Sequence, residues 1–456
     1  MNIAAAYSAK GFATYTPLKI TIAYLGATFL LLVFGPIEYL DMPIGKTAGF
    51  LTAAATAIIV GYMFGVAARM KNPRGDPRGA LAMASILFDL SLGIALFALA
   101  TSIGQSIAAD GLSFSLSGMG EGYLAAYEGY ERNSGNYSFS FILYSISLPF
   151  SFIATVWGIY YFRRLSPLRR YLTLILIFGG LYYYVIGTGK QKQIGDLVIY
   201  ILAIALVKYG VRGRRINLKT ILGAVIGGFV AVLLFVAVLG QRYAALGVDS
   251  GNINQRILFR MSFDTGHPVF IIFGQDYGLS LAIFSSYLTQ GYYGLGLALE
   301  TDWVWTRFSG FSYSISIIAD RLFGLEWQWS NTLLHRTGLA TGWNESKWHT
   351  VFTYFATDFT WPGTVVLFGF FAFAYARCWL VAVSHQNPFA ILLFTLLTMG
   401  MFFMPANNQL LHSPGALFTF LMVVILYLVN AGRNYSLQSI GAPKRCSGTR
   451  PLAASP

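Results

Sequence analysis

Long apolar blocks alternate with short polar connections along most of this chain. Each block has about 20 residues, the length at which a helix crosses about 30 Å of hydrocarbon. The blocks lack the ten-residue alternation that is typical of membrane barrels. We therefore predict an all-α polytopic membrane protein with ten transmembrane helices, at 20–39, 47–68, 80–107, 139–162, 171–188, 194–210, 220–240, 364–384, 388–404 and 415–431.

One long interruption divides the pattern. It predicts transmembrane helices 1–7 within 1–240, a large periplasmic loop at 241–361, and transmembrane helices 8–10 within 362–432. Residues 433–456 are predicted to form a basic, disordered cytoplasmic tail. Inside the loop, 278–299 is apolar but rich in glycine and polar residues. That mixture favours an interfacial or re-entrant helix over a crossing.

The charges give the direction of the helices. Only 11% of the residues are charged, against roughly a quarter in soluble domains. The net charge of +13 is distributed unevenly, with 20 of the 31 basic residues on connections that share one face. The positive-inside rule makes that face and both termini cytoplasmic. Its basic residues are Lys10, Lys19, Arg69, Lys71, Arg74, Arg78, Arg163, Arg164, Arg169, Arg170, Lys208, Arg212, Arg214, Arg215, Lys219, Arg377, Arg433, Lys444, Arg445 and Arg450.

Several kinds of chemistry have no place in this layout. The cytoplasmic connections have roughly ten residues each, too few for a nucleotide-binding domain, and no phosphate-binding or dinucleotide-binding glycine motif occurs. Two cysteines, Cys378 and Cys446, predict no disulfide framework. An enzyme acting on the outer face would therefore use energy already stored in its substrate, as in a lipid-linked, pyrophosphate-activated sugar.

Several cations are predicted at the outer mouth of the bundle. Two lysines occupy the turn G-T-G-K-Q-K-Q, and three arginines follow the seventh span. Such a group suits a diphosphate, whose oxygens arginine binds in a bidentate manner. The alternative is that Arg256 and Arg260 pair with Asp249 and Asp264, or bind lipid phosphates. The candidate pyrophosphate-binding residues are Lys190, Lys192, Arg242, Arg256 and Arg260.

A second polar group lies in K-W-H-T-V-F-T-Y-F-A-T-D-F-T-W-P-G, residues 347–363. His349 is the leading candidate for a base that takes a proton from a sugar hydroxyl. Asp358 is its candidate support, and Glu345 is a second candidate base. The alternatives are an interfacial histidine and a helix-capping aspartate before Pro362. On a straight helix His349 and Asp358 would face opposite sides, so a dyad requires a bend.

This stretch resembles a known family. His349, Asp358 and Gly363 fall at the spacing of H-N-x-[FY]-L, an acid nine residues after the His and a Gly fourteen after it, as in the O-antigen ligase and Wzy-type polymerase superfamily. The segment is also similar to the D-F-G-x-x-G variant of oligosaccharide repeat-unit polymerases. Thr350 and Thr360 depart from the pattern, and lysines replace the arginine of the family's G-[ST]-R-[GT] turn.

The resemblance implies a GT-C-like fold and a metal-independent, inverting glycosyltransferase without a cofactor. Its partners would be an undecaprenyl-pyrophosphate-linked oligosaccharide, membrane lipids and a chain-length regulator protein, at the bacterial cytoplasmic (inner) membrane. The expected activity is that of an O-antigen polymerase in polysaccharide biosynthesis, which joins a growing glycan to the next lipid-linked repeat unit. A ligase that uses lipid A–core as acceptor is the alternative.

A membrane transporter or flippase is the rival from another class. Asp89 and Asp196 would then line its pathway, because carboxylates within spans often mark function. Glu300 and Asp302 form a carboxylate pair that could bind a metal in another kind of glycosyltransferase, although such a lone pair is more often a solvated turn. No metal ligands are expected from the other histidines.

Overall fold

The computed structural model describes residues 14–69, 77–110, 122–123, 139–212, 218–245, 260–324 and 328–430. Each of the ten predicted apolar segments overlaps a helical element within these ranges, although the first, 20–39, runs past the end of α3 into β1 (Ile37–Tyr39). The elements are α3 (Thr16–Phe34), α4 (Ile44–Ala67), α5 (Pro77–Asp110), α7 (Phe139–Tyr161), α8 (Pro167–Leu174) with the π-helical η2 (Ile175–Gly179) and η3 (Tyr182–Gly187), α9 (Lys192–Arg212), α10 (Leu218–Ala245), α15 (Val351–His385), α16 (Pro388–Phe402) and α17 (Pro414–Asn430).

The chain is a multi-pass α-helical membrane protein. Eight helices in the described part are long and apolar enough to cross a membrane, and α16 and α17 are apolar but shorter. The eighth predicted segment, 364–384, lies in the second part of α15, which starts after a kink at Thr360, whose φ is 61°. The first part, residues 351–359, is a helix that the hydropathy pattern did not predict. The helix therefore consists of a buried first part and a long second part.

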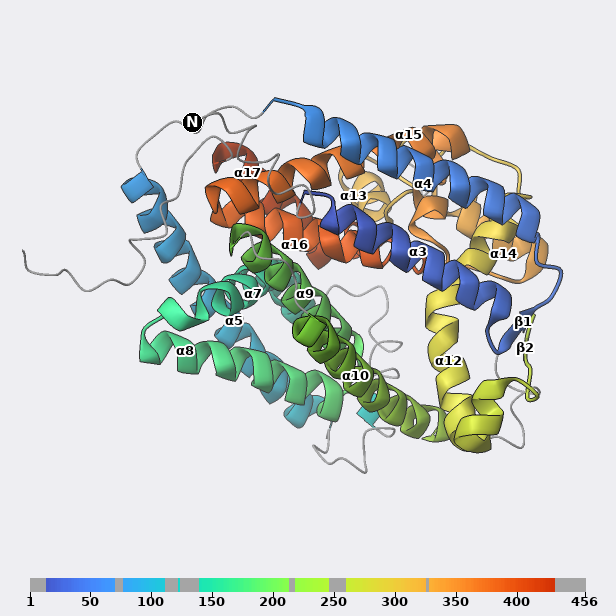
Figure 1. Ribbon diagram of the computed structural model, residues 1–456, viewed down its shortest axis with the longest axis horizontal. Helices are drawn as coiled ribbons and strands as arrows, with labels where there is room; N and C mark the ends of the chain where they lie inside the picture. The colour runs from blue at the N-terminus through green and yellow to red at the C-terminus, as the bar shows by residue number, and fades with distance from the viewer. Residues whose placement is uncertain are drawn as a thin grey trace, which may run out of the picture.

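α12 (Pro268–Ala298) covers the segment 278–299, for which the sequence indicated an interfacial or re-entrant helix. By length and composition it is also one of the helices that could span a membrane. In Figure 1 it runs across the direction of α3 and α4, near the end where α3 stops and α4 starts. It packs against α3, α10 and α14 (Leu333–Thr341), and Gly274, with φ 77°, breaks it near its start.

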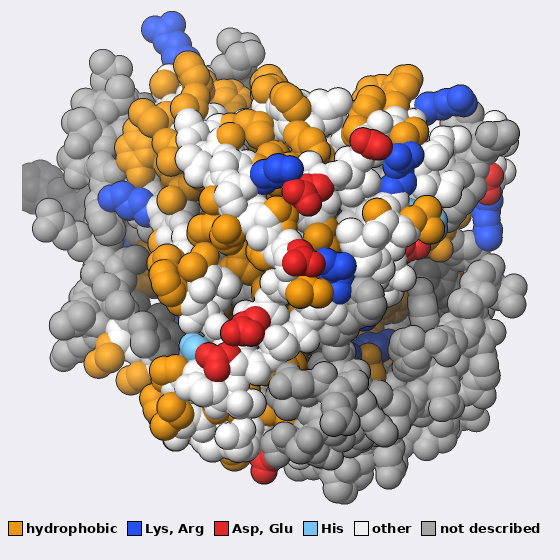
Figure 2. Space-filling model, turned by 90° about the vertical axis from the view of Figure 1, so that its right-hand side faces the viewer, with side chains coloured by type: hydrophobic (Ala, Val, Ile, Leu, Met, Phe, Trp, Pro, Cys, Tyr) orange, Lys and Arg blue, Asp and Glu red, His pale blue; other side chains and the backbone are white. Residues whose placement is uncertain are grey.

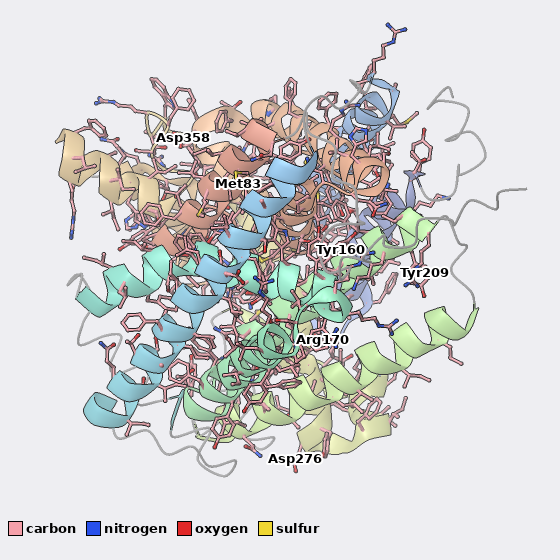
Figure 3. The ribbon with its side chains drawn as sticks, turned by 90° about the vertical axis from the view of Figure 1, so that its left-hand side faces the viewer. Met83, Tyr160, Arg170, Tyr209, Asp276 and Asp358 are labelled. Carbon is pink, nitrogen blue, oxygen red and sulfur yellow. The ribbon has the colours of Figure 1, made fainter. Side chains whose placement is uncertain are left out.

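The segment after α10 is tied to the first helix pair by a small sheet. β1 (Ile37–Tyr39) pairs in antiparallel fashion with β2 (Met261–Phe263), with Ile37 opposite Phe263. α13 (Tyr313–Phe323) and the 3-10 turn η4 (Gln328–Asn331) follow, and another 3-10 turn, η1 (Phe162–Arg164), ends α7. In Figure 3, Asp276 of α12 lies at the lower edge and Asp358 of α15 near the top. The segment thus reaches across the molecule.

Close packing at the centre fixes the arrangement. α16 is buried on nearly every side, as expected of a helix that is apolar all round. α4 and α15 approach so closely that a Cβ on Gly61 would lie 2.0 Å from the carbonyl oxygen of Gly369. Small residues permit this approach between membrane helices. Figure 2 shows the end near β1 and β2, where acidic and basic side chains are scattered among hydrophobic ones.

Candidate functional site

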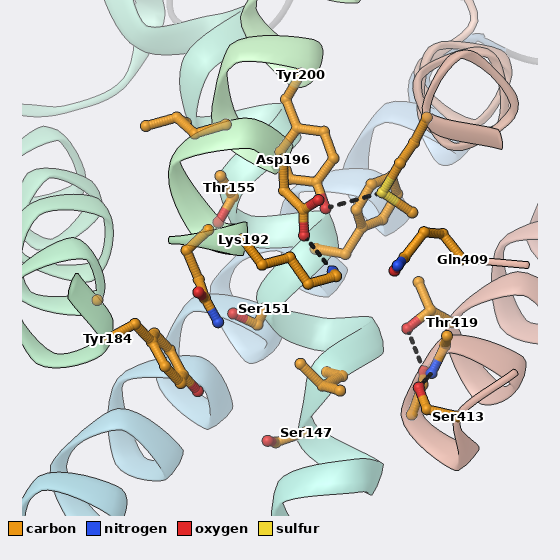
Figure 4. A pocket seen from close by; sticks show the side chains of 18 of the residues that line it. Ser147, Ser151, Thr155, Tyr184, Lys192, Asp196, Tyr200, Gln409, Ser413 and Thr419 are labelled. Atoms are coloured by element: carbon orange, nitrogen blue, oxygen red, sulfur yellow. Dashed lines mark hydrogen bonds and ion pairs between the residues drawn. The ribbon is translucent and has the colours of Figure 1, made fainter. Parts of the chain in front are cut away.

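A cavity of about 510 Å³ lies inside the helical bundle, within the size range of small-ligand sites (Figure 4). Its walls come from α5, α7, η2, η3, α9, α16 and α17, and from the connection 407–413 between the last two helices. Much of the lining is polar, although the surrounding helices are apolar. Polar lining residues are Ser102, Tyr144, Ser147, Ser151, Thr155, Tyr184, Lys192, Gln193, Asp196, Tyr200, Asn407, Asn408, Gln409, His412, Ser413 and Thr419.

An ion pair stands in this cavity. Lys192 Nζ lies 2.6 Å from Asp196 Oδ2, four residues on along α9. Figure 4 shows the two side chains joined, with Gln409 and Ser413 on the opposite wall. The Asp196 side chain is only 14% exposed, and its Oδ1 is buried without a hydrogen-bond partner within the described residues. One oxygen of this carboxylate can therefore accept a hydrogen bond or a proton from a ligand.

Other lining atoms share that property. Gln193 Oε1, Asn407 Oδ1 and His412 Nδ1 are buried and, in the described part of the chain, have no partner. Burial lowers the pKa of His412 to about 4, so its ring is neutral at pH 7. Buried polar atoms without partners cost about 1–3 kcal/mol each. The cavity is thus suited to a ligand rich in hydroxyl groups, or to water.

The turn before α9 places a lysine at its tip. Gly189 has φ 61°, a conformation that residues with a side chain seldom adopt. The amide of Lys190 donates to the carbonyl of Tyr184 over 2.9 Å, and the Thr188 hydroxyl donates to the same carbonyl over 2.7 Å. The predicted G-T-G-K-Q-K-Q segment is therefore a tight turn.

Lys190 lies close enough to Arg242 for the two charges to interact. Burial among surrounding protein atoms, and then the Arg242 guanidinium, lower the pKa of Lys190, although its side chain keeps contact with solvent. Neither residue forms an ion pair with a carboxylate in the described part of the chain. Two like charges without a counter-charge disfavour each other, so an anion would be stabilised beside them.

Tyrosines hold the arginine in place. Arg242 donates to the hydroxyl groups of Tyr123 and, over 3.4 Å, Tyr287. Its guanidinium carbon lies 3.6 Å from the centre of the Tyr123 ring, within the range of a cation–π contact. Its Nε is buried and has no described partner. The guanidinium is fixed without being neutralised.

The other predicted cations are placed differently. Arg260 donates to Tyr293 over 2.8 Å and pairs with Asp41 over 3.2 Å, so its partner is not the expected Asp264. Its φ of 66° fixes this turn next to β2. Lys192 pairs with Asp196 inside the cavity. Arg256 lies outside the described residues, as does Asp249.

His349 is completely buried. Its Nε2 lies 3.3 Å from the carbonyl oxygen of Asn344, and its Nδ1 has no described hydrogen-bond partner. The ring packs so closely on Gly294 that a Cβ there would lie 2.9 Å from Nδ1. Burial lowers the pKa of His349 to about 4, despite neighbouring carbonyl groups that favour protonation. The ring is neutral at pH 7 and has no exposed area, so its role here is to pack against Gly294 and Asn344.

Asp358 does not contact His349. Its Oδ1 accepts hydrogen bonds from the Thr306 hydroxyl at 2.6 Å and the Phe308 amide at 2.8 Å. Its Oδ2 accepts from the Phe311 amide at 2.8 Å. The two predicted dyad members therefore have separate partners, and Asp358 fixes a loop about 50 residues earlier in the chain.

Three other candidate carboxylates have ion-pair or hydrogen-bond partners. Glu345 Oε1 lies 3.2 Å from His335 Nδ1, while its Oε2 is buried without a described partner. Glu300 pairs with Lys46 at 2.9 Å, and Asp89 pairs with Arg169 near the surface. Within the described residues, no group of three or more His, Cys, Asp or Glu side chains is arranged to hold a metal ion.

One wall of the cavity does not follow from the hydropathy pattern. The predicted spans 388–404 and 415–431 leave the run N-N-Q-L-L-H-S, residues 407–413, as a connection between them. Its signal was the unusual density of amides in so short a link between very apolar helices. No protein-family model, curated protein or solved structure matches this chain.

Proposed function

We propose that this protein is a membrane glycosyltransferase that polymerises glycans from lipid-linked repeat units on the outer face of the cytoplasmic membrane. The observation that carries the proposal is the pair of Lys190 and Arg242, two cations without a carboxylate partner among the described residues, in a chain with a polar cavity inside its bundle. The resemblance of residues 349–363 to the O-antigen polymerase family points the same way.

In this proposal the cations bind the pyrophosphate of an undecaprenyl carrier. Arginine binds its oxygens in a bidentate manner, and lysine contributes a point charge. Both stabilise the charge that develops as the bond between the sugar carbon and the pyrophosphate oxygen breaks. The pyrophosphate then leaves on its lipid.

The acceptor sugar occupies the cavity. Its hydroxyl groups donate to the buried acceptor atoms Gln193 Oε1, Asn407 Oδ1 and His412 Nδ1. Asp196 Oδ1 is the group placed to take the proton of the attacking hydroxyl, while Lys192 holds the other oxygen. His349 and Asp358 then act as positioning residues, because one is fully buried and the other has both oxygens bound.

The test uses the full-length protein in proteoliposomes with undecaprenyl-pyrophosphate repeat units, a chelator and no nucleotide sugars. A ladder of longer lipid-linked glycans is expected. Lys190→Gln and Arg242→Gln should each lower the rate by at least about tenfold, the size expected from losing a charged contact to a phosphate. The matched control is Lys46→Gln, which removes only an exposed ion pair.

The other outcomes separate the alternatives. Product that forms only with added lipid A–core would identify a ligase. No product with either acceptor would rule out both transferases.

A flippase is the second candidate, because the Lys192–Asp196 pair stands inside the bundle, where transporters place their binding groups. Movement of the lipid-linked sugar across the bilayer, without elongation, would support it. Asp89 does not contribute to this reading, since it pairs with Arg169 near the surface.

A further inference from the structure

A loop after α12 exposes large aromatic side chains together with an arginine. Trp303, Trp305 and Phe308 are 40%, 48% and 53% exposed. Arg307 lies among them, is exposed, and forms no ion pair within the described residues. We call residues 303–308 the aromatic loop. Exposed aromatic rings cost free energy in water, so we expect the aromatic loop to bind a partner or a membrane.

The loop is held in an unusual backbone conformation. Arg307 and Phe308 are consecutive non-glycine residues with φ of 54° and 60°. Such residues cost about 1–3 kcal/mol each and persist only where surrounding contacts fix them. Here Asp358 supplies those contacts through its bonds to the Thr306 hydroxyl and the Phe308 amide. Trp303 Nε1 adds bonds of 2.9 Å to the carbonyl groups of Ala356 and Thr357.

The contacts also place the loop along the membrane-spanning helix α15. The Phe308 ring lies 5.5 Å from that of Phe359, the residue before the kink at Thr360. Past the kink, Val366 and Phe370 are 59% and 67% exposed and lie four residues apart on one face. That face is apolar, as expected of a helix surface that faces lipid tails.

We propose that the aromatic loop is an interfacial anchor that binds phospholipid headgroups of the outer leaflet. Its rings would lie at headgroup level, as tryptophan and other aromatic side chains do in membrane proteins. Arg307 binds the lipid phosphate, to which its guanidinium is complementary. The anchor keeps the connection between α12 and α13 at the membrane surface, and its chemistry does not rest on the glycosyltransferase proposal.

The loop chemistry favours lipid over sugar. A sugar platform combines aromatic rings with free carboxylate, amide or hydroxyl groups that bind the sugar hydroxyls. Within residues 303–308 the one neutral polar side chain is Thr306, and its hydroxyl is already bonded to Asp358. Arg307 is a cation among exposed rings and has no ion-pair partner in the described part of the chain, which matches a lipid phosphate.

The test places a fluorophore on the loop. Trp305→Cys carries the label. Cys446→Ser removes one native cysteine, and the other, Cys378, is kept because it is buried. The labelled protein is assembled in phospholipid nanodiscs. Lipids with a headgroup nitroxide or with bromines near the top of the acyl chain should quench the label at least about twofold more than they quench Ser346→Cys, a control in an exposed polar turn. Lipids with bromines near the chain end should quench it little.

Two results would overturn the anchor. One is quenching by aqueous iodide equal to that at Ser346→Cys, with no effect of the modified lipids. The other is protection from iodide that appears only on addition of lipid-linked glycan, which would identify a sugar platform.

Arg307→Gln supplies an independent readout for the phosphate contact. In nanodiscs that carry the nitroxide on anionic phosphatidylglycerol or on zwitterionic phosphatidylcholine, the Trp305→Cys label should be quenched more by the anionic lipid. Arg307→Gln should abolish this preference while the acyl-chain quenching persists. An unchanged preference would refute the role of Arg307.

Discussion

A single carboxylate, Asp358, connects two distant parts of the chain. All three of its hydrogen-bond donors belong to residues 306–311, and it is 5% exposed. Asp358→Asn leaves the oxygen acceptors incomplete and places an amide donor against a backbone N–H. We expect a loss of about 3 kcal/mol, the scale for bonds to a buried charged group.

Thermal unfolding in detergent measures that loss of stability. The control is Asp302→Asn, a substitution of the exposed aspartate that precedes the aromatic loop. An Asp358→Asn protein that unfolds at the wild-type temperature but lacks activity would show that the carboxylate acts in chemistry instead of holding the loop.

His349 predicts a pH dependence. Its pKa of about 4 in the folded protein lies below the ordinary value of 6.5, so the folded state binds its proton less readily than the unfolded state. The stabilisation is therefore present above pH 6.5 and is lost as pH falls from 6.5 through 4, by about 3 kcal/mol. His349→Gln should flatten the unfolding temperature across this window, and an unchanged slope would contradict the burial of the ring.

The spacing motif singled out His349 and Asp358, which both hold the structure together, but it did not give their contacts. His349 packs against Gly294, and Asp358 binds a loop that starts at Thr306. Such partners lie about 50 residues away, and the distance between them depends on folding of the whole segment. The same holds for the cations. Lys190 and Arg242 lie on different elements, and the sequence pattern does not predict how those elements are placed relative to each other.

At the level of helices, hydropathy predicted the elements well because lipid requires a continuous apolar run with satisfied backbone groups. It missed the first part of α15, residues 351–359. Pro362 and Gly363 indicated a helix start, and the second part of α15 does start there, after the kink at Thr360 with its positive φ. The early part of α15 is buried by protein, so its aromatic and polar residues did not register as a span.

The contact between α4 and α15 gives a prediction about packing. Gly61 faces Gly369, and Gly65 faces Phe373 and Ala376, with no room for a Cβ in either place. Gly61→Val must push the helices apart, so we expect a loss of several kcal/mol in stability, or failure to insert. Gly49 is the control, since a Cβ there meets nothing within 4 Å. Equal unfolding temperatures for Gly61→Val and Gly49→Val would contradict the packing.

At the level of the whole molecule, the cavity, the cation pair and the aromatic loop belong together only if the end with β1 and β2 faces outward. Asp302, beside the aromatic loop, is exposed at that end, and Leu168, the second residue of α8, is 68% exposed beside basic residues. Positive residues next to Leu168, such as Arg169 and Arg170, favour the cytoplasmic side.

A labelling experiment tests this orientation in a protein that also carries Cys446→Ser. A membrane-impermeant maleimide added to intact spheroplasts should label Asp302→Cys and leave Leu168→Cys unlabelled, whereas in lysed cells it should label both. Labelling of Leu168→Cys alone in intact spheroplasts would show that the protein has the opposite orientation in the membrane. The cations would then face the cytoplasm, and an outer-face glycosyltransferase would be ruled out together with the placement of the lipid anchor in the outer leaflet.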